Sequence, residues 1–161
     1  MTNPHAPVPP SPSRAAARLA VMLSGSGRTL LNLLDAIADG RLHATIPLVI
    51  ASRECLGAER ARARGLHTLV MPGTIPRDRL GEVLAEHRID LVALAGYLRL
   101  IEVPEAFRGR IVNIHPALLP AFGGKDMYGD RVHAAVLAAG VPATGCTVHL
   151  VDNRYDTGPI I

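Results

Sequence analysis

Short apolar runs alternate with segments of helical periodicity along most of the chain, and this alternation restricts the possible folds more than any other feature. Strands are expected over residues 19–23, 46–51, 67–70, 91–95, 111–114 and 147–151. Helices are expected over residues 30–38, 57–64, 76–87 and 130–139. This order predicts an α/β fold, a mostly parallel twisted sheet of Rossmann-like type with helices on both faces. Ligands bind such a sheet beyond the carboxyl ends of its strands.

The beginning of the chain differs from the rest. Residues 1–17 are rich in proline and serine and have no apolar periodicity, which indicates a disordered tail. A single folded domain is therefore expected over residues 18–161. No apolar run approaches the roughly 18 residues of a membrane-spanning helix, and no secretion signal is recognisable. Cys55 and Cys146 lie far apart without metal-ligand spacing, so we expect a reduced, cytoplasmic compartment and no metal.

The charge pattern bears on the class of partner. The net charge is +3, and the basic residues are interleaved with acidic ones instead of forming a stripe. Aromatic residues make up only 3% of the chain, so it lacks the aromatic residues for a base-stacking platform. This pattern argues against a nucleic-acid binder and suits small anionic substrates such as phosphates and carboxylates.

A glycine-rich turn follows the first expected strand. Its residues are Ser24, Gly25, Ser26, Gly27, Arg28 and Thr29. Glycine lets the backbone approach a ligand closely, and the free N–H groups at the start of the next helix favour an anion. A dinucleotide fingerprint would need a third glycine where Leu30 stands, although Arg53 could imitate an arginine that selects a phosphorylated dinucleotide. The turn fits a phosphate monoester best, and the alternative is a tight turn without a ligand.

Polar side chains also end the fifth expected strand. Asn113 and His115 point to the same side of that strand, because successive side chains alternate. An amide and an imidazole side by side could supply an oxyanion donor and a proton-transfer group, or they could be structural. A carboxylate from residues 152–159 beside His115 would favour its imidazolium form. The residues alone do not show which aspartate does so, since Asp152 is also typical of a turn cap.

Four motifs, taken together, resemble the glycinamide ribonucleotide formyltransferases, within the wider formyltransferase family. They are Leu23-Ser24-Gly25-Ser26-Gly27 with Leu30 and Asn32, Ala95-Gly96-Tyr97-Leu98-Arg99-Leu100, Asn113-Ile114-His115-Pro116-Ala117-Leu118-Leu119-Pro120, and Gly145-Cys146-Thr147-Val148-His149 leading to Asp156-Thr157-Gly158-Pro159-Ile160-Ile161. The resemblance extends from Leu19 to Ile161. It implies that the domain transfers the formyl group of 10-formyltetrahydrofolate to the amine of glycinamide ribonucleotide in purine biosynthesis, without a metal.

The resemblance also assigns roles to individual residues. The catalytic residues would be Asn113, His115 and Asp156. The substrate phosphate would bind Gly25, Ser26, Gly27, Arg28 and Thr29. The folate would lie against Leu98, Arg99, Leu100, Ile101, Val151 and Asp152. The partners implied are these two small molecules, with no nucleic acid and no membrane, and the protein would be a monomer or homodimer.

Other functions share parts of this pattern. A formyltetrahydrofolate hydrolase has the same Asn-His-Asp trio but usually carries an amino-terminal regulatory domain. A methionyl-tRNA formyltransferase would be longer. Family members continue for several dozen residues beyond Ile161, so a C-terminally shortened chain is expected, and a ligand-binding domain without activity is the third alternative. The roles of His133, His149 and Lys125 stay open.

Overall fold

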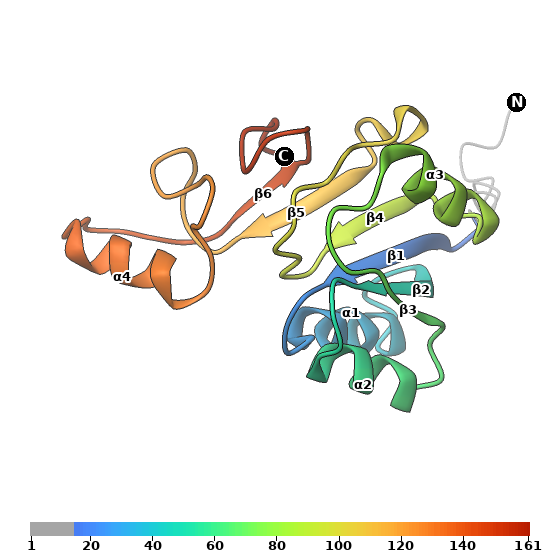
Figure 1. The fold of residues 1–161 in the computed structure, drawn as a ribbon. Helices are drawn as coiled ribbons and strands as arrows, with labels where there is room; N and C mark the ends of the chain where they lie inside the picture. Colours follow the sequence, from blue (N-terminus) through green and yellow to red (C-terminus); the bar gives the residue numbers. More distant parts are fainter. Residues whose placement is uncertain (1–14) are drawn as a thin grey trace, which may run out of the picture.

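The computed structural model describes residues 15–161, whose strands form one six-stranded sheet (Figure 1). The strands are β1 (Ala17–Leu23), β2 (Ala44–Ala51), β3 (Thr68–Val70), β4 (Leu91–Leu94), β5 (Ile111–His115) and β6 (Thr147–Leu150). Their order across the sheet is β3-β2-β1-β4-β5-β6, and all neighbouring pairs are parallel except β5 with β6. This confirms the mostly parallel, Rossmann-like sheet. Most of the predicted tail, residues 1–14, lies outside the described residues.

Helices cover both faces of the sheet, as predicted. They are α1 (Arg28–Ala38), α2 (Leu56–Ala63), α3 (Arg77–Glu86) and α4 (Asp130–Ala138), with a short 3-10 helix, η1 (Glu105–Phe107), that the sequence pattern did not predict. The side chains of β1 alternate between two buried clusters. Leu19, Val21 and Leu23 pack with α1 and α2, whereas Ala20 and Met22 pack with α3. A central strand buried on both faces explains the almost unbroken apolar run in β1.

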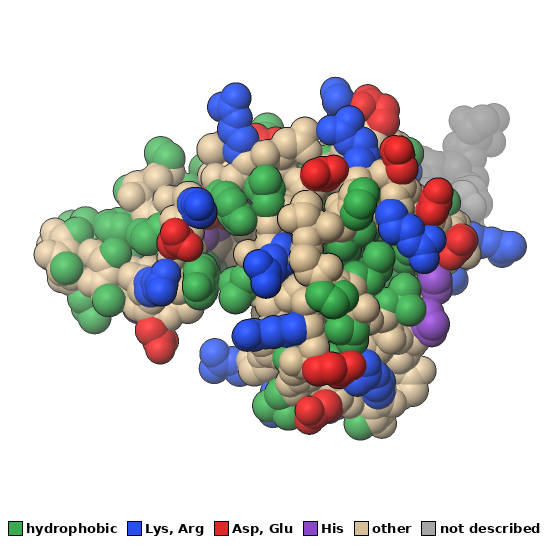
Figure 2. Space-filling model, viewed as in Figure 1, with side chains coloured by type: hydrophobic (Ala, Val, Ile, Leu, Met, Phe, Trp, Pro, Cys, Tyr) green, Lys and Arg blue, Asp and Glu red, His purple; other side chains and the backbone are tan. Residues whose placement is uncertain are grey.

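The fourth helix belongs to neither layer. In Figure 1, α4 projects away from the sheet at the left of the view, and Figure 2 shows the same part as a separate lobe. Its buried residues Val132 and Val136 form a small cluster with Ala117, against which Phe122 and Met127 also pack. This cluster is distinct from the two that cover the sheet, so α4 is held by fewer apolar contacts than the other helices.

The antiparallel pairing of β5 with β6 separates polar from apolar side chains. Asn113 lies opposite His149, and His115 lies opposite Thr147, on one face of the pair. Ile114 and Val148 are paired on the other face and are 42% and 38% exposed. Because side chains alternate along each strand, this register brings the polar residues of both strands to the same face.

The surface agrees with the expected charge pattern. On the face drawn in Figure 2, basic and acidic side chains are interspersed. Within residues 15–161, no helix has the length and apolar character that crossing a membrane requires.

Tyr97, just after β4, buries an unpaired hydroxyl group. The residue is 8% exposed, and within the described part of the chain its hydroxyl is the one buried side-chain polar atom without a hydrogen-bond partner. A buried hydroxyl without a partner costs about 1–3 kcal/mol. We therefore expect Tyr97→Phe to raise the free energy of unfolding by about 1 kcal/mol, measured by urea denaturation at pH 8.

The same substitution should change the pH dependence of stability. Burial raises the pKa of Tyr97 to about 12, whereas a tyrosine in an unfolded chain ionises near about pH 10. The unfolded state therefore loses this proton first, and the contribution of Tyr97 to stability falls as the pH rises from about 10 to about 12. Denaturation curves across this interval should show a shallower decline for Tyr97→Phe than for the unaltered chain. If Tyr97→Phe instead lowers the free energy of unfolding, the Tyr97 hydroxyl has a hydrogen-bond partner.

Candidate active site

The glycine-rich turn joins β1 to α1 and depends on two glycines. Gly27 is the residue before the helix, with φ 73°, a conformation that glycine adopts without strain. A Cβ on Gly27 would lie 2.7 Å from Gly57 Cα, and a Cβ on Gly57 would lie 2.8 Å from Gly25 O, so a side chain at either position would collide with the backbone. Gly25, Ser26 and Gly27 therefore form a tight turn at the carboxyl end of β1, and Arg28 and Thr29 are the first residues of α1. No acidic side chain stands in the first turn of α1.

The carbonyl groups of this turn are held by α2 and by two arginines. Gly57 N donates a hydrogen bond to Gly25 O at 2.9 Å. Arg53 Nε donates to Ser24 O at 3.0 Å, and Arg60 Nη1 donates to Ser26 O at 2.7 Å. The contacts fix the turn and place two guanidinium charges beside it. An anion at the start of α1 would be attracted by those charges and by the helix dipole.

Asn113 on β5 and His149 on β6 are in direct contact. Asn113 Nδ2 lies 3.0 Å from His149 Nε2, and His149 Nδ1 lies 2.8 Å from the carbonyl oxygen of Leu150. A carbonyl only accepts, so Nδ1 carries a hydrogen, and in that tautomer Nε2 accepts from the Asn113 amide. His149 is 2% exposed and is therefore a buried part of the site.

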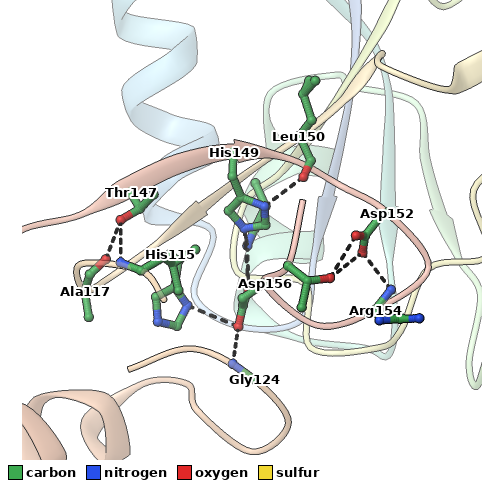
Figure 3. A network of polar contacts seen from close by, with 12 residues as sticks. His115, Ala117, Gly124, Thr147, His149, Leu150, Asp152, Arg154 and Asp156 are labelled. Carbon is green, nitrogen blue, oxygen red and sulfur yellow. Dashed lines mark hydrogen bonds and ion pairs between the residues drawn. The ribbon is translucent and has the colours of Figure 1, made fainter. Parts of the chain in front are cut away.

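Asp156 links the three other polar residues of the site, and Figure 3 shows its contacts with His115, His149 and Gly124. Its Oδ1 lies 3.3 Å from Asn113 Nδ2 and 3.5 Å from His149 Nε2. Its Oδ2 lies 3.5 Å from His115 Nδ1 and accepts a hydrogen bond from Gly124 N at 2.9 Å. With φ 55°, Asp156 adopts the left-handed conformation that aspartate tolerates better than most residues. The sequence left the choice of aspartate open, and the structure places Asp156 beside His115.

The loop that carries Asp156 is tied back to β6. Leu150 N donates to Pro159 O at 2.8 Å, and Ile161 N donates to Val148 O at 3.0 Å. A Cβ on Gly158 would collide with Leu150 O, so only glycine fits there. These contacts fix the end of the loop close to β6.

Asp152 has a different role from Asp156. Its carboxylate accepts hydrogen bonds from Thr157 Oγ1 at 2.8 Å and 3.0 Å and from Arg154 N at 2.8 Å. Asp152 therefore caps the 152–157 loop and shapes the segment that carries Asp156. This is the turn-capping role that the sequence left as an alternative.

Both ring nitrogens of His115 have partners. Nδ1 faces Asp156, and Nε2 lies 2.7 Å from the carbonyl oxygen of Phe122. Thr147 Oγ1 donates to Ala117 O and accepts from Leu119 N, which holds the start of this covering segment beside β6. His115 is 3% exposed as a result. The Phe122 carbonyl thus occupies a position where the oxygen of a ligand could accept from His115.

Two cavities border Asp156. The smaller, about 50 Å³, is lined by Asn113, His149 and Asp156. Its other lining residues are Leu94, Tyr97, Arg99, Leu100, Ile101, Val151, Asp152, Arg154 and Tyr155, which include every predicted folate-binding residue except Leu98. The larger, about 420 Å³, lies against Pro120, Gly123 and residues 155–158. Asp156 therefore lies at the border of both spaces, with its side chain 11% exposed.

Sequence reasoning did not assign several parts of this network. His149 was left open because one histidine within an apolar strand is usually structural. Because side chains alternate along a strand, His149 points to the same face as Thr147, two residues earlier, and this could have placed it on the polar face. The Gly124 amide and Phe122 carbonyl act through the backbone, for which no residue pattern exists. His133 and Lys125 are exposed, and in the described part of the chain neither forms a hydrogen bond or ion pair with Asn113, His115 or Asp156. Within residues 15–161, no cluster of three His, Cys, Asp or Glu residues could hold a metal ion.

The chain is similar in sequence to one family of known proteins. Residues 17–161 match the formyl transferase family. A phosphoribosylglycinamide formyltransferase of Mycobacterium tuberculosis is 43% identical over 162 residues, which cover 96% of this chain and 71% of that protein. The chloroplastic phosphoribosylglycinamide formyltransferase of Arabidopsis thaliana is 44% identical over 155 residues, 89% of this chain and 53% of that protein.

The solved structures agree with these sequence matches. The crystal structure of glycinamide ribonucleotide transformylase 1 from Symbiobacterium toebii superimposes with a TM-score of 0.80 at 41% identity, covering 91% of this chain and 71% of that one. The chain spans about half the length of the chloroplastic relatives from Arabidopsis thaliana and Vigna unguiculata, 53% and 49%.

Proposed function

Because this chain belongs to the formyl transferase family, and within it to the phosphoribosylglycinamide formyltransferases, we propose that it transfers the formyl group of 10-formyltetrahydrofolate to the amine of glycinamide ribonucleotide. The observation that carries this proposal is the contact of Asp156 with both Asn113 and His115 at the edge of a cavity. The folate is assigned to the smaller cavity, with Leu98 beside it, and the substrate phosphate to the turn over residues 25–29. Both cavities would widen when ligands enter.

The Asn113 amide contacts two acceptors in this structure. His149 Nε2 and Asp156 Oδ1 lie 3.0 Å and 3.3 Å from Nδ2 and 3.5 Å from each other. An amide has two N–H bonds, so each acceptor can be served by one of them. Donation to the oxyanion of the tetrahedral intermediate therefore requires that one of these contacts is exchanged for the ligand when the substrates bind.

His115 supplies the second oxyanion donor in this mechanism. Its Nε2 hydrogen now points to the Phe122 carbonyl, and the reacting formyl oxygen would take the place of that carbonyl. The segment that contains Phe122 must therefore move when the substrates bind. Asp156 orients the ring through Nδ1 while Nε2 donates to the substrate.

The chemical step is a direct acyl transfer. The amine nitrogen of glycinamide ribonucleotide attacks the formyl carbon, a C–N bond forms, and the carbonyl electrons move to oxygen. When the oxyanion collapses, the bond from carbon to folate nitrogen breaks. The attacking amine loses one proton and the leaving nitrogen gains one. Asp156 is placed to relay this proton, directly or through water, since it borders both cavities. Holding both substrates together supplies much of the rate.

The compartment is proposed to be the cytoplasm. Cys55 is half-buried, Cys146 is exposed, and both are free thiols, as expected where thiols stay reduced. Glycinamide ribonucleotide and the formyl folate are the proposed small-molecule partners, with a monomer or homodimer as the assembly.

A formyl-transfer assay on the purified 161-residue chain tests the proposal. The chain is mixed with 10-formyltetrahydrofolate, with and without glycinamide ribonucleotide, and release of tetrahydrofolate is followed by absorbance. We expect release that depends on the amine. Equal release without the amine would indicate hydrolysis of the formyl folate. A folded chain that binds 10-formyltetrahydrofolate but produces no tetrahydrofolate would contradict catalysis by this chain.

A further inference from the structure

Two buried serines lie at the carboxyl ends of β1 and β2. Ser24 is 2% exposed and Ser52 is 5% exposed, and their hydroxyl oxygens are 2.7 Å apart. The Ser24 hydroxyl also accepts a hydrogen bond from Leu98 N at 2.9 Å. Both lone pairs of the Ser24 oxygen are therefore used, one by Ser52 and one by the backbone that follows β4. Neither serine has a part in the chemistry proposed above.

The contact with Leu98 matters because the segment around it has few other attachments. Within the part of the chain that the structure describes, residues 97–101 make one hydrogen bond to other residues, from Leu98 N to Ser24 Oγ. Tyr97 and Ile101 are buried, which fixes the two ends of the segment, but Leu98 and Arg99 are exposed. Just before the segment, Gly96 O also accepts a hydrogen bond from Ser24 N at 3.1 Å, so the bond to Leu98 N sets the path of the backbone between Gly96 and the buried Ile101.

We infer that Ser24, although it directly precedes the residues assigned to the substrate phosphate, is a positioning residue for the folate. This inference rests on the proposed function, because that function assigns Leu98, Arg99 and Leu100 to the folate. Ser52 supports the same role by donating its hydroxyl hydrogen to Ser24, which leaves the other lone pair for Leu98. A hydroxyl group of one ligand-binding segment thus fixes the backbone of the other.

The phosphate turn does not need the Ser24 hydroxyl. Its backbone is held by Gly57 N on Gly25 O, by Arg60 on Ser26 O and by Arg53 on Ser24 O. None of these bonds involves a Ser24 side-chain atom, so alanine at position 24 keeps all of them. The same substitution removes the hydrogen-bond partner that Leu98 N has within residues 15–161, so the 97–101 segment can take other paths. The change should therefore affect the folate site and spare the phosphate site.

The test measures the binding of each ligand separately to the full chain by isothermal titration calorimetry. For Ser24→Ala we expect the Kd of tetrahydrofolate to rise about tenfold, since a hydrogen bond is lost and a backbone N–H is left unpaired. The Kd of glycinamide ribonucleotide should stay within about twofold. Ser52→Ala should weaken folate binding about threefold, because the Ser24 hydroxyl loses its donor. The double variant should match Ser24→Ala alone.

Thr68→Val is the matched control. Thr68 Oγ1 donates to Leu66 O at 3.0 Å, so valine deletes a similar hydroxyl bond at the far edge of the same sheet. This variant should bind both ligands as the unaltered chain does. Thermal unfolding of every variant shows that it is folded, and Ser52→Ala keeps the test decisive if Ser24→Ala is unstable.

The possible results separate the inference from the proposed function. Unchanged folate affinity in Ser24→Ala, or an equal loss of affinity for both ligands, would overturn the positioning role while the proposed function stands. An unaltered chain that binds neither ligand would contradict the proposed function and the inference with it. Selective loss of folate affinity would support both.

Discussion

Asp156→Asn is expected to lower kcat/KM for formyl transfer by about 10³–10⁴, as replacing the carboxylate that orients a catalytic histidine does in other acyl-transfer enzymes. The two Asp156 oxygens face Asn113, His149, His115 and Gly124. An asparagine has only one oxygen, so its NH₂ group must face a donor on one side. The variant keeps the shape of the site but loses its charge and its proton relay. Steady-state kinetics should place the loss mainly in kcat.

Asp126→Asn is a close control for this substitution. Asp126 also has a left-handed backbone conformation, with φ 69°, but its side chain is exposed and lies outside the network. It should retain activity within about twofold. A folded Asp156→Asn variant with near-normal kcat would remove Asp156 from the mechanism.

Asn113→Ala is expected to lower kcat by about 10²–10³, the usual cost of losing one oxyanion donor. Alanine removes the N–H group that donates to the oxyanion and also the contact that holds His149 beside Asp156. Ile114→Ala tests whether truncation in β5 is itself harmful, because Ile114 is the next residue and points to the opposite, exposed face.

The Kd of tetrahydrofolate separates a catalytic role of Asn113 from a binding role. Ile114→Ala should keep most of the activity, and the Kd of tetrahydrofolate should change much less than kcat in Asn113→Ala. If kcat is unaffected while folate affinity falls, Asn113 is a binding residue and the oxyanion role is wrong. Combining Asn113→Ala with Asp156→Asn should cost little beyond Asp156→Asn alone, since the two residues act as a unit.

The elements of the fold could be predicted from the sequence because each has a strong period. The run 91–95 predicted β4, and the helix expected over residues 30–38 corresponds to α1, within a residue or two in each case. The direction of β6 could not be predicted, because alternation along a strand is the same for parallel and antiparallel pairing. The position of α4 also could not be predicted from the pattern of apolar residues. An apolar stripe shows that a helix packs against something, without showing that its partners are a separate small cluster.

The candidate site shows a similar division. The residue pattern placed Asn113 and His115 on one side of β5, and the family resemblance then supplied Asp156. Both expectations concern side chains. The contacts that sequence could not supply are set by register and backbone, such as His149 lying opposite Asn113 and the Phe122 carbonyl lying on His115. The Ser24–Ser52 contact joins residues 28 positions apart, and two serines after two strands have no distinctive pattern.

The small cluster beneath α4 has a consequence for how the protein opens. Local unfolding draws on the parts with the least buried apolar surface, so α4 and its cluster form a unit with a lower opening free energy than the sheet. Phe122 packs against that cluster, and its carbonyl covers Nε2 of His115. Opening of α4 with its cluster would therefore uncover the imidazole while the sheet stays folded.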